Sequence, residues 1–390
     1  MRILVDTSCW ENRRGYGRFT RELTSSLVAA FSGKHEFILL TDRISASRNC
    51  FPEGARVVAV ATSEQPIRAA SSTGARSLVD MLRFGWTARR QRAEVLFFPT
   101  PYTYFPILYG TPMVLCVHDT MTETLPEMFF ATRQARLRWR VKLWLARHQA
   151  RRIVSPSEQA RRDVAREFGI PIEKIGRIGE GIAAAFVPTQ DPSTIRATLD
   201  RYGLATPPPI VLYVGGVSLH KNLDGLVRAL ARVKSDCQLV IVGEVKNDSY
   251  LGASRKLQSV IDELGMGNRV AFTGYVPDAD LAALYHAARL LVQPSFAEGF
   301  GLPVVEAMAC GTPVAVSRRG ALPEIVGDAG LYFDPQDIGE MAATIDRLLS
   351  DDDLRNTRGL RGQDMAREHT WKRAAEQTMA VLVEVAAEAI

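Results

Sequence analysis

Short apolar runs alternate along the chain with longer stretches whose apolar residues recur at helical spacing, and this alternation constrains the fold more than any other feature. It is typical of β-α units, which build parallel sheets with helices on both faces. The sequence therefore predicts an α/β protein. The predicted strands are residues 2–6, 36–41, 56–60, 94–98, 113–118, 152–155, 210–215, 238–242, 269–273, 290–293 and 313–317.

A chain of 390 residues is too long for one ordinary core, so we expect two domains. Residues 187–209, which include five prolines, interrupt the alternation just before a new apolar run. We predict doubly wound domains over residues 1–186 and 210–370, joined by a linker over 187–209. A helix over 371–390 either ends the second domain or packs back on the first. Ligands bind at the carboxyl ends of such strands, so two facing domains would form a cleft.

The sequence argues against several classes of protein. The opening MRILVDTSCW is too short and too soon polar for a signal peptide, and no run of about 18 apolar residues could span a membrane. The five cysteines are scattered without a C-x-x-C pair, which fits reduced thiols and argues against a zinc site or disulfide framework. We therefore expect a cytoplasmic protein.

Residues 133–152 carry much of the positive charge, with eight Arg or Lys and no acid. This segment is either a surface helix with solvated arginines and an apolar core face, or a face that meets anionic lipid headgroups or a phosphorylated acceptor. The second interpretation places the protein peripherally at the inner membrane. Nucleic acid is not favoured, because no aromatic-interleaved basic pattern or helix-turn-helix is present. At helical spacing one stripe contains Arg133, Arg136, Arg140, Arg147 and Arg151, flanked by Trp139 and Leu143 on one side and by Leu137, Val141 and Trp144 on the other.

The segment SFAEGFGLPVVEAMACGTPV, residues 295–314, places Glu298 and Glu306 around a glycine pair in apolar surroundings. Pro303 suits the first turn of a helix and Gly311 suits its end. Glu298 therefore lies on a strand-to-helix loop, with Glu306 about one turn inside the helix. Free N–H groups at residues 300–302 would bind an anion at the helix N-terminus. Alternatively, Glu298 only caps the helix and Glu306 is solvated.

The motif EGFGLPVVEAMACGTPV, followed by ALPEIVGDAGLYFDP, closely resembles the donor-site signature of family-4 retaining glycosyltransferases of the GT-B fold. The segments VLYVGGVSLHKN and RVAFTGYVPDADLAALYHAA occur in the family's order, and GYGRFTREL, VHD and IVSPSEQARRDV in the first half are similar too. The resemblance covers nearly the whole chain. It implies two Rossmann-like domains with an interdomain cleft, and transfer of a sugar from a nucleoside diphosphate to an acceptor hydroxyl.

The resemblance also implies roles for single residues. Glu298 would contact the donor sugar near the reacting centre, and Glu306 would hold the ribose hydroxyls. Lys221 would neutralise the diphosphate, which also follows from charge because a leaving diphosphate needs a fixed cation where no metal is present. Backbone N–H groups would come from Phe300, Gly301 and Leu302.

Gly216 is the one departure from the family pattern. Members often have an arginine beside the glycine that ends this strand, five residues before Lys221, and here Gly216 occupies that donor-binding position. The neighbouring His220 would substitute as a cation or, in the plainer interpretation, is a surface-loop histidine.

In the first half, Gly15, Gly17 and Arg18 precede a helical pattern. In the family this loop lies over the donor phosphates and faces the acceptor, which implies donor-binding glycines and an acceptor-side Arg18; otherwise Arg18 only begins a helix. His118 and Asp119 close a predicted strand on its ligand-binding edge. We expect His118 to order the donor sugar or acceptor and Asp119 to lie on the acceptor side, unless His118 is merely satisfied by a neighbouring loop.

Two acidic clusters resemble metal sites only superficially. Asp278-Ala279-Asp280 spells D-x-D but follows a proline and opens a helical run, so we interpret it as an N-cap. Residues 351–353 likewise precede a helical segment. We expect neither a metal nor a cofactor.

The sequence thus favours a glycosyltransferase. The first-half pattern and the missing arginine resemble the mannosyltransferase-type branch that builds bacterial surface polysaccharides, so GDP-mannose is the favoured donor and a glycan or lipid-linked molecule the expected acceptor. A UDP-sugar-dependent transferase and a non-catalytic nucleotide-binding regulatory protein of the same fold remain alternatives. A nicotinamide dehydrogenase is not supported, because no G-x-G-x-x-G follows residues 2–6 or 210–215 with an acid about 20 residues on.

Overall fold

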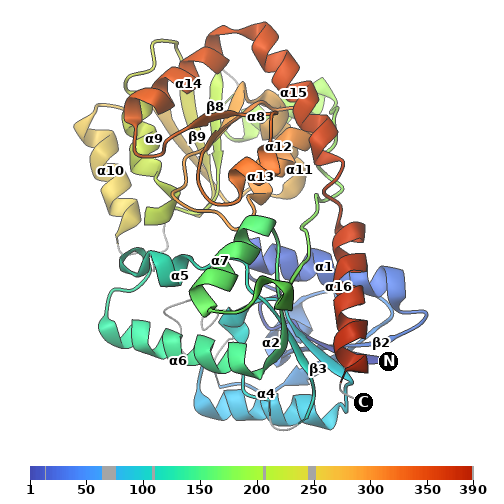
Figure 1. Ribbon diagram of the computed structural model, residues 1–390. Helices are drawn as coiled ribbons and strands as arrows, with labels where there is room; N and C mark the ends of the chain where they lie inside the picture. The colour runs from blue at the N-terminus through green and yellow to red at the C-terminus, as the bar shows by residue number, and fades with distance from the viewer. Residues whose placement is uncertain (14, 64–75, 108–109, 205–207, 245–251, 389–390) are drawn as a thin grey trace. The chain divides into compact units, whose positions relative to one another are not determined.

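The computed structural model describes residues 1–13, 15–63, 76–107, 110–204, 208–244 and 252–388 (Figure 1). The chain divides into two compact units. Unit 1 contains Met1–Gly181 together with Thr370–Ile390, and unit 2 contains Ile182–His369. Both ends of the chain therefore belong to unit 1.

Unit 1 is built on a seven-stranded, all-parallel sheet with the strand order β3-β2-β1-β4-β5-β6-β7. The central strands β1, β4 and β5 are almost continuous apolar runs because both faces of the sheet are buried there, whereas the edge strands β3 and β7 are partly exposed. Their bounds are β1 (Arg2–Asp6), β2 (Glu36–Asp42), β3 (Ala55–Val60), β4 (Val95–Phe98), β5 (Met113–Cys116), β6 (Ala150–Ser155) and β7 (Ile175–Arg177).

Three helices of unit 1 cover one face of this sheet, because Phe84, Ala146 and Val164 share an apolar cluster with alternate residues of the strands. Another pair, α1 and α16, pack against each other, and α16 also contacts β4, β5 and β6. The helices are α1 (Gly15–Phe31), α2 (Arg43–Arg48), α4 (Leu78–Arg90), η1 (Pro101–Thr103), α5 (Met121–Thr124), η2 (Pro126–Met128), α6 (Arg133–Gln149), α7 (Glu158–Phe168), η3 (Ile172–Lys174) and α16 (Trp371–Ala387).

Unit 2 has a six-stranded parallel sheet with the order β10-β9-β8-β11-β12-β13. Its strands are β8 (Ile210–Val214), β9 (Gln238–Val242), β10 (Val270–Gly274), β11 (Leu290–Gln293), β12 (Val314–Ser317) and β13 (Leu331–Phe333). Its helices are α8 (Pro192–Arg201), η4 (Leu219–Lys221), α9 (Leu223–Leu230), α10 (Ala253–Glu263), η5 (Gly267–Arg269), α11 (Asp278–Ala287), α12 (Leu302–Ala309), α13 (Leu322–Val326), α14 (Ile338–Ser350) and α15 (Asp352–Ala366).

Both sheets are doubly wound in the Rossmann order. The strand order reverses between β1 and β4 in unit 1 and between β8 and β11 in unit 2. The loops that leave two such strands diverge to opposite faces of the sheet and open a crevice at the carboxyl ends, where ligands of this fold bind. The α/β prediction is therefore confirmed, and each unit has one expected ligand-binding edge.

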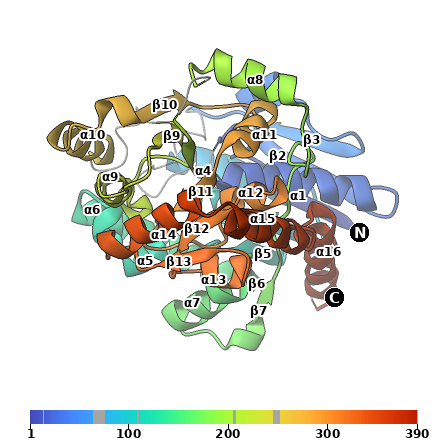
Figure 2. The same ribbon diagram turned by 90° about the horizontal axis from the view of Figure 1, so that it is seen from above.

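The proline-rich segment predicted as a linker, residues 187–209, contains a helix of unit 2; its residues 205–207 lie outside the described part of the chain. This helix, α8, lies beside α11 in both views (Figure 2). Arg201 pairs with Asp280 at 2.6 Å, and the Tyr202 hydroxyl donates to the same carboxylate at 3.0 Å. Pro192 stands at the start of α8, where its missing N–H is tolerated.

No helix in the described ranges has both the length and the apolar character that crossing a bilayer requires.

The C-terminal helix should contribute to the stability of unit 1. Leu382 of α16 is fully buried, whereas its neighbour Val383 is 44% exposed. Leu382→Ala should lower the free energy of unfolding by about 2–5 kcal/mol, and Val383→Ala by no more than about 0.5 kcal/mol. Urea unfolding of the two variants measures the difference. Equal effects would mean that α16 is not docked on unit 1.

Candidate functional site

Two loops meet at the β8–β11 reversal of unit 2. The first contains η4 and ends at Asn222, whose backbone is left-handed with φ at 54°. The side-chain amide of Asn222 donates to the carbonyls of Pro294, at 3.2 Å, and Pro335, at 2.8 Å. Asn222 thereby fixes the loop after β8 against the loop after β11.

A charge pair lies between these loops. Lys221 Nζ donates to Glu298 Oε1 at 2.6 Å, although the two residues are 77 positions apart in the chain. The same oxygen accepts from Gln293 Nε2 at 2.6 Å and Ser295 Oγ at 2.7 Å. The Glu298 side chain is 9% exposed and the Lys221 side chain 20%, so the pair is partly shielded but reachable.

The surroundings keep Glu298 ionised. Burial by itself would raise the pKa of this carboxyl. The Lys221 ammonium and the hydrogen bonds from Lys221 and Ser295 outweigh burial and hold the pKa below its usual value. Glu298 is therefore a fixed negative charge in an apolar setting, and it is suited to accept hydrogen bonds rather than to donate a proton.

The loop that follows Glu298 ends at the N-terminus of α12. Gly301 has φ at 104°, a conformation that favours glycine, and it precedes the first helical residue. Within the described residues, the N–H groups of Phe300, Gly301 and Leu302 meet no protein acceptor. Three such donors together with the helix dipole would suit an anion at this end of α12, and the predicted role of these N–H groups in binding the donor stays a prediction.

Gly320 is a residue of this site that the sequence did not reveal. A Cβ at Gly320 would lie 2.5 Å from the carbonyl oxygen of Glu298 and 2.6 Å from its nitrogen, and φ there is 60°. The Ala321 N–H also donates to the Glu298 carbonyl at 2.9 Å. The bend at Gly320 thus supports the backbone of Glu298, and only tertiary structure shows this.

Glu306 is separate from the charge pair. It lies on α12, is 1% exposed, and accepts a hydrogen bond from the Tyr285 hydroxyl at 3.1 Å. It is therefore not the solvated helix residue that was one of the two alternatives. Its assignment to ribose stays a prediction.

His220 differs from both interpretations drawn from the sequence. It is 8% exposed, so it is not a surface histidine, and its Nδ1 lies 3.2 Å from Ser218 Oγ. Burial and the neighbouring Lys221 lower its pKa to about 3, so it is neutral and supplies no second cation. At Gly216 a Cβ would meet no heavy atom within 4 Å. There is therefore space for a side chain at this position, and crowding does not explain the glycine.

In unit 1, His118 follows β5 and is held on both ring nitrogens. Nε2 lies 2.8 Å from the Pro99 carbonyl and must carry a proton, because a carbonyl only accepts. Nδ1 lies 3.3 Å from Glu180 Oε1, and the Phe19 ring packs edge-on at 4.5 Å between centroids. Burial would lower the pKa of His118, but Cys116 and Glu180 raise it well above its ordinary value. The imidazolium is therefore poorly suited to act as a general base.

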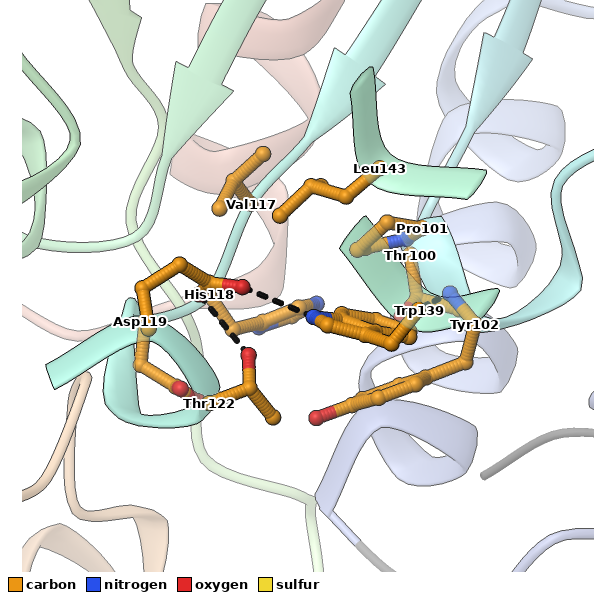
Figure 3. A pocket seen from close by; sticks show the side chains of 10 residues that line it. Thr100, Pro101, Tyr102, Val117, His118, Asp119, Thr122, Trp139 and Leu143 are labelled. Atoms are coloured by element: carbon orange, nitrogen blue, oxygen red, sulfur yellow. Dashed lines mark hydrogen bonds between the residues drawn. The ribbon is translucent and has the colours of Figure 1, made fainter. Parts of the chain in front are cut away.

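His118 lines a small pocket of about 10 Å³, room for roughly one water molecule. Figure 3 shows the rings of Tyr102 and Trp139 on one side of this pocket and His118, Asp119 and Thr122 on the other. The rings of Tyr102 and Trp139 lie 5.0 Å apart, and Trp139 Nε1 donates to Glu123 at 2.7 Å. Tyr102 and Glu123 were not predicted from the sequence, in which the aromatic run PYTYF after β4 is the available signal for Tyr102.

Close packing explains one of the two glycines at the start of α1. Helix α1 begins at Gly15, and a Cβ at Gly17 would lie 2.0 Å from the Asn12 carbonyl oxygen. Gly17 therefore allows α1 to approach the preceding loop. Arg18 lies in the first turn of α1, and Asp119 accepts from the Met121 N–H at 2.9 Å in a local turn. The roles assigned to these residues and to Gly15 stay predictions.

One prediction about the two acidic clusters is wrong. Helix α11 begins at Asp278 with Pro277 as its N-cap, so the aspartates lie in the first turn rather than at the cap. Asp351 is the N-cap of α15 and accepts from the Leu354 N–H at 2.8 Å. In the described ranges, no cluster of three or more His, Cys, Asp or Glu could hold a metal ion.

Removing the Glu180 carboxylate should lower the His118 pKa. We expect histidine-selective NMR of the wild type to show His118 still protonated above pH 6.5, and Glu180→Gln to shift its titration downward. His118→Gln assigns the signal, and His220, neutral throughout, serves as an internal control. The pKa of His118 is raised in the folded state, so its contact with Glu180 stabilises the fold fully below about pH 6.5, the ordinary pKa of histidine. This stabilisation is lost as the pH rises through the raised pKa of His118 in the folded protein. Titration near 6.5 in both proteins would contradict the assignment.

Two family descriptions together span most of the chain. Residues 195–365 match Glycosyl transferases group 1, and residues 14–181 match the Glycosyl transferase 4-like domain. The chain is 34% identical over 272 residues to O-antigen chain mannosyltransferase B of Escherichia coli, covering 68% of each protein. It is 32% identical over 286 residues to MMP alpha-(1->4)-mannosyltransferase of Mycolicibacterium hassiacum, covering 70% of this chain and 65% of that protein.

Among solved structures, the fold is similar to that of sucrose-phosphate synthase from Thermosynechococcus elongatus, with a TM-score of 0.78, 22% identity and full coverage of both chains. That likeness and the two doubly wound sheets establish the GT-B fold. The two family matches and the extent of the Escherichia coli alignment show that this chain is a glycosyltransferase and belongs to the group 1 family, with a glycosyltransferase 4-like domain at its N-terminal end.

Proposed function

We propose that this protein transfers a mannosyl group from GDP-mannose to a hydroxyl of a glycan or lipid-linked acceptor, with retention of the anomeric configuration, in the synthesis of a bacterial surface polysaccharide. The Lys221–Glu298 pair at the β8–β11 reversal is the observation that carries the proposal. The donor sugar is supported by the two relatives, both named mannosyltransferases.

In this proposal the diphosphate leaving group binds between Lys221 and the N-terminus of α12. The ammonium and the N–H groups at residues 300–302 oppose the negative charge that grows as the glycosidic bond breaks. These groups are positioned before the reaction, because Glu298 and the turn at Gly301 hold them in place. No metal is needed to neutralise the leaving group.

Glu298 serves the sugar. Among the described residues, its three donors all contact Oε1. We assign Oε2 to a hydroxyl of the donor sugar, because an ionised carboxylate accepts strongly and sugar hydroxyls are donors. Glu306 is assigned to the ribose by resemblance alone.

His118 is proposed to orient substrate rather than to remove a proton. Its two nitrogens already contact Pro99 and Glu180, and its raised pKa favours the charged form. The pocket between His118 and the aromatic pair of Tyr102 and Trp139 holds about one water molecule, so His118 would act on a substrate through its positive charge rather than by enclosing it. This assignment is compatible with retention, in which a single general base is not required.

Lys221→Met should reduce transfer strongly. Loss of one preorganised charge on a leaving group costs roughly 10²–10³-fold in kcat. Lys256→Met is the matched control, because Lys256 also forms a 2.6 Å ion pair in unit 2, with Asp224. Nucleotide release from GDP-mannose, measured with and without a membrane extract as the source of acceptor, gives the rates.

The paired variants distinguish a site from a structural contact. The Lys256→Met protein should transfer at close to the wild-type rate, and both variants should unfold cooperatively. Equal activity of the two variants would remove Lys221 from the site. A wild type that binds nucleotide but never releases it from any sugar donor would favour a regulatory protein that retains the fold.

A panel of nucleotide sugars should identify the donor. A ligand that binds only the native state stabilises it by about 2.7 kcal/mol when present at about 100 times its Kd. We expect GDP-mannose to raise the thermal midpoint more than UDP-, ADP- or dTDP-sugars at equal concentration. If a UDP-sugar gives the larger shift, the mannosyl assignment is wrong and the glycosyltransferase assignment is unaffected. The one-bond carbon–proton coupling at the anomeric carbon of the product, which differs between α- and β-mannosides, tests retention.

A further inference from the structure

Exposed apolar side chains gather on two helices of unit 1. Seven of the thirteen large apolar residues that are exposed in the described ranges lie on α4 and α6, which Figure 1 locates in the lower part of the view. On α4 they are Leu78, Val79, Leu82 and Trp86, and on α6 they are Leu137, Val141 and Trp144. Both tryptophans are about half exposed, at 51% and 50%.

The two helices cover the same face of the seven-stranded sheet. Phe84 of α4 and Ala146 of α6 belong to one apolar cluster with the strands beneath them. The segment after η1 connects the helices, because Phe105 contacts Phe84 at 5.3 Å between ring centroids and the Tyr104 hydroxyl donates to Gln149 of α6 at 2.6 Å. The outward sides of α4 and α6 therefore belong to one layer of the molecule.

The core of the protein does not account for these side chains. The core-facing side of α6 consists of Trp139, Leu143 and Ala146, which are at most 6% exposed. Leu137, Val141 and Trp144 lie on the other flank of the arginine stripe and remain in solvent. An apolar surface of this kind marks a contact with another apolar phase or molecule.

Positive charge accompanies the apolar surface. Arg136, Arg138 and Arg140 are exposed, and within the described residues no carboxylate forms an ion pair with them. Arg147 lies 5.2 Å from the Phe168 ring, and Arg90 of α4 lies 5.3 Å from the Trp86 ring. Many other arginines in this protein pair with acids, so the unpaired group on α6 is compatible with an external anion.

A groove runs along α6 on its α7 side, with a volume of about 600 Å³. Arginines and exposed apolar residues of α6 line it together with Phe168 of α7. Two acids also line it: Glu123 accepts a hydrogen bond from Trp139, and Glu167 pairs with Arg166. The groove thus combines cationic and apolar walls, the combination that accommodates a lipid headgroup and the first part of its chains.

We propose that α4 and α6 form a docking face for an anionic phospholipid bilayer. Basic residues beside exposed apolar side chains, with tryptophans at the boundary, are the composition of a surface that lies in the headgroup region. The rim of a protein–protein interface is expected to contain both positive and negative side chains. The charged side chains on α6 are instead all positive. The proposal does not depend on the identity of the sugar donor.

Vesicle flotation tests this face. We expect the full-length protein to float with vesicles of phosphatidylglycerol and phosphatidylcholine, but not with phosphatidylcholine alone. Arg136→Gln/Arg140→Gln should lower the partition coefficient roughly 30-fold. Each basic residue near an anionic surface contributes about 1 kcal/mol of attraction, and the loss of two corresponds to that factor. Arg232→Gln/Arg255→Gln removes two exposed arginines from unit 2 and should leave binding unchanged.

Trp86→Ser/Trp144→Ser tests the apolar part of the face independently. Vesicles should shift the tryptophan emission of the wild type to the blue, and this variant should lose the shift and most of the binding while keeping its unfolding midpoint. No flotation with anionic vesicles, or equal loss of binding in the unit 2 control, would overturn the proposal. So would a wild-type dimer, seen by analytical ultracentrifugation, that these tryptophan substitutions dissociate without any vesicle binding.

Discussion

The Lys221–Glu298 ion pair is the interaction on which the candidate site depends. Taking two charges out of water costs free energy that their attraction does not always repay, so such a pair persists only where the surroundings complete its hydrogen bonds. Here Gln293 and Ser295 share the accepting oxygen, and the glycine turn at Gly320 leaves room for the backbone of Glu298. The pair stands at the reversal of strand order, where the Rossmann topology opens its ligand-binding edge. The charge pair therefore lies where the topology of the sheet predicts a ligand-binding site.

The sequence predicted the elements that depend on local pattern and missed those that depend on tertiary contacts. Eleven strands follow from apolar runs, but β7 and β13 have three residues each and are too short to show a period. Helix α8 was hidden by the prolines around it. Glu298, Lys221 and the glycine turn were identified from a motif, yet the motif did not show that the two charges touch. The supporting roles of Gly320 and Asn222, and the burial of His220, come from residues far apart in the chain.

The two candidate functional features of unit 1, His118 and the outer surface of α4 and α6, lie in different parts of the unit. His118 lies after β5, at the edge where the strands of a doubly wound sheet bind ligands, and its charge is fixed by Glu180. The apolar and basic surface of α4 and α6 instead covers the face of the sheet. A protein that uses a lipid-linked acceptor would benefit from both, because a surface held at the bilayer keeps the ligand-binding edge near the headgroups. The proposed membrane contact would explain why the tryptophans of α4 and α6 are exposed and why the arginines of α6 have no acidic partner among the described residues.

A crystal structure of the complex with GDP tests the central claim most directly. The account predicts that diphosphate oxygens lie within hydrogen-bonding distance of Lys221 Nζ and of the N–H groups of Phe300 and Gly301, with the Lys221–Glu298 contact preserved or exchanged for phosphate. Nucleotide bound elsewhere on unit 2, with Lys221 still paired only to Glu298 and the start of α12 empty, would contradict it.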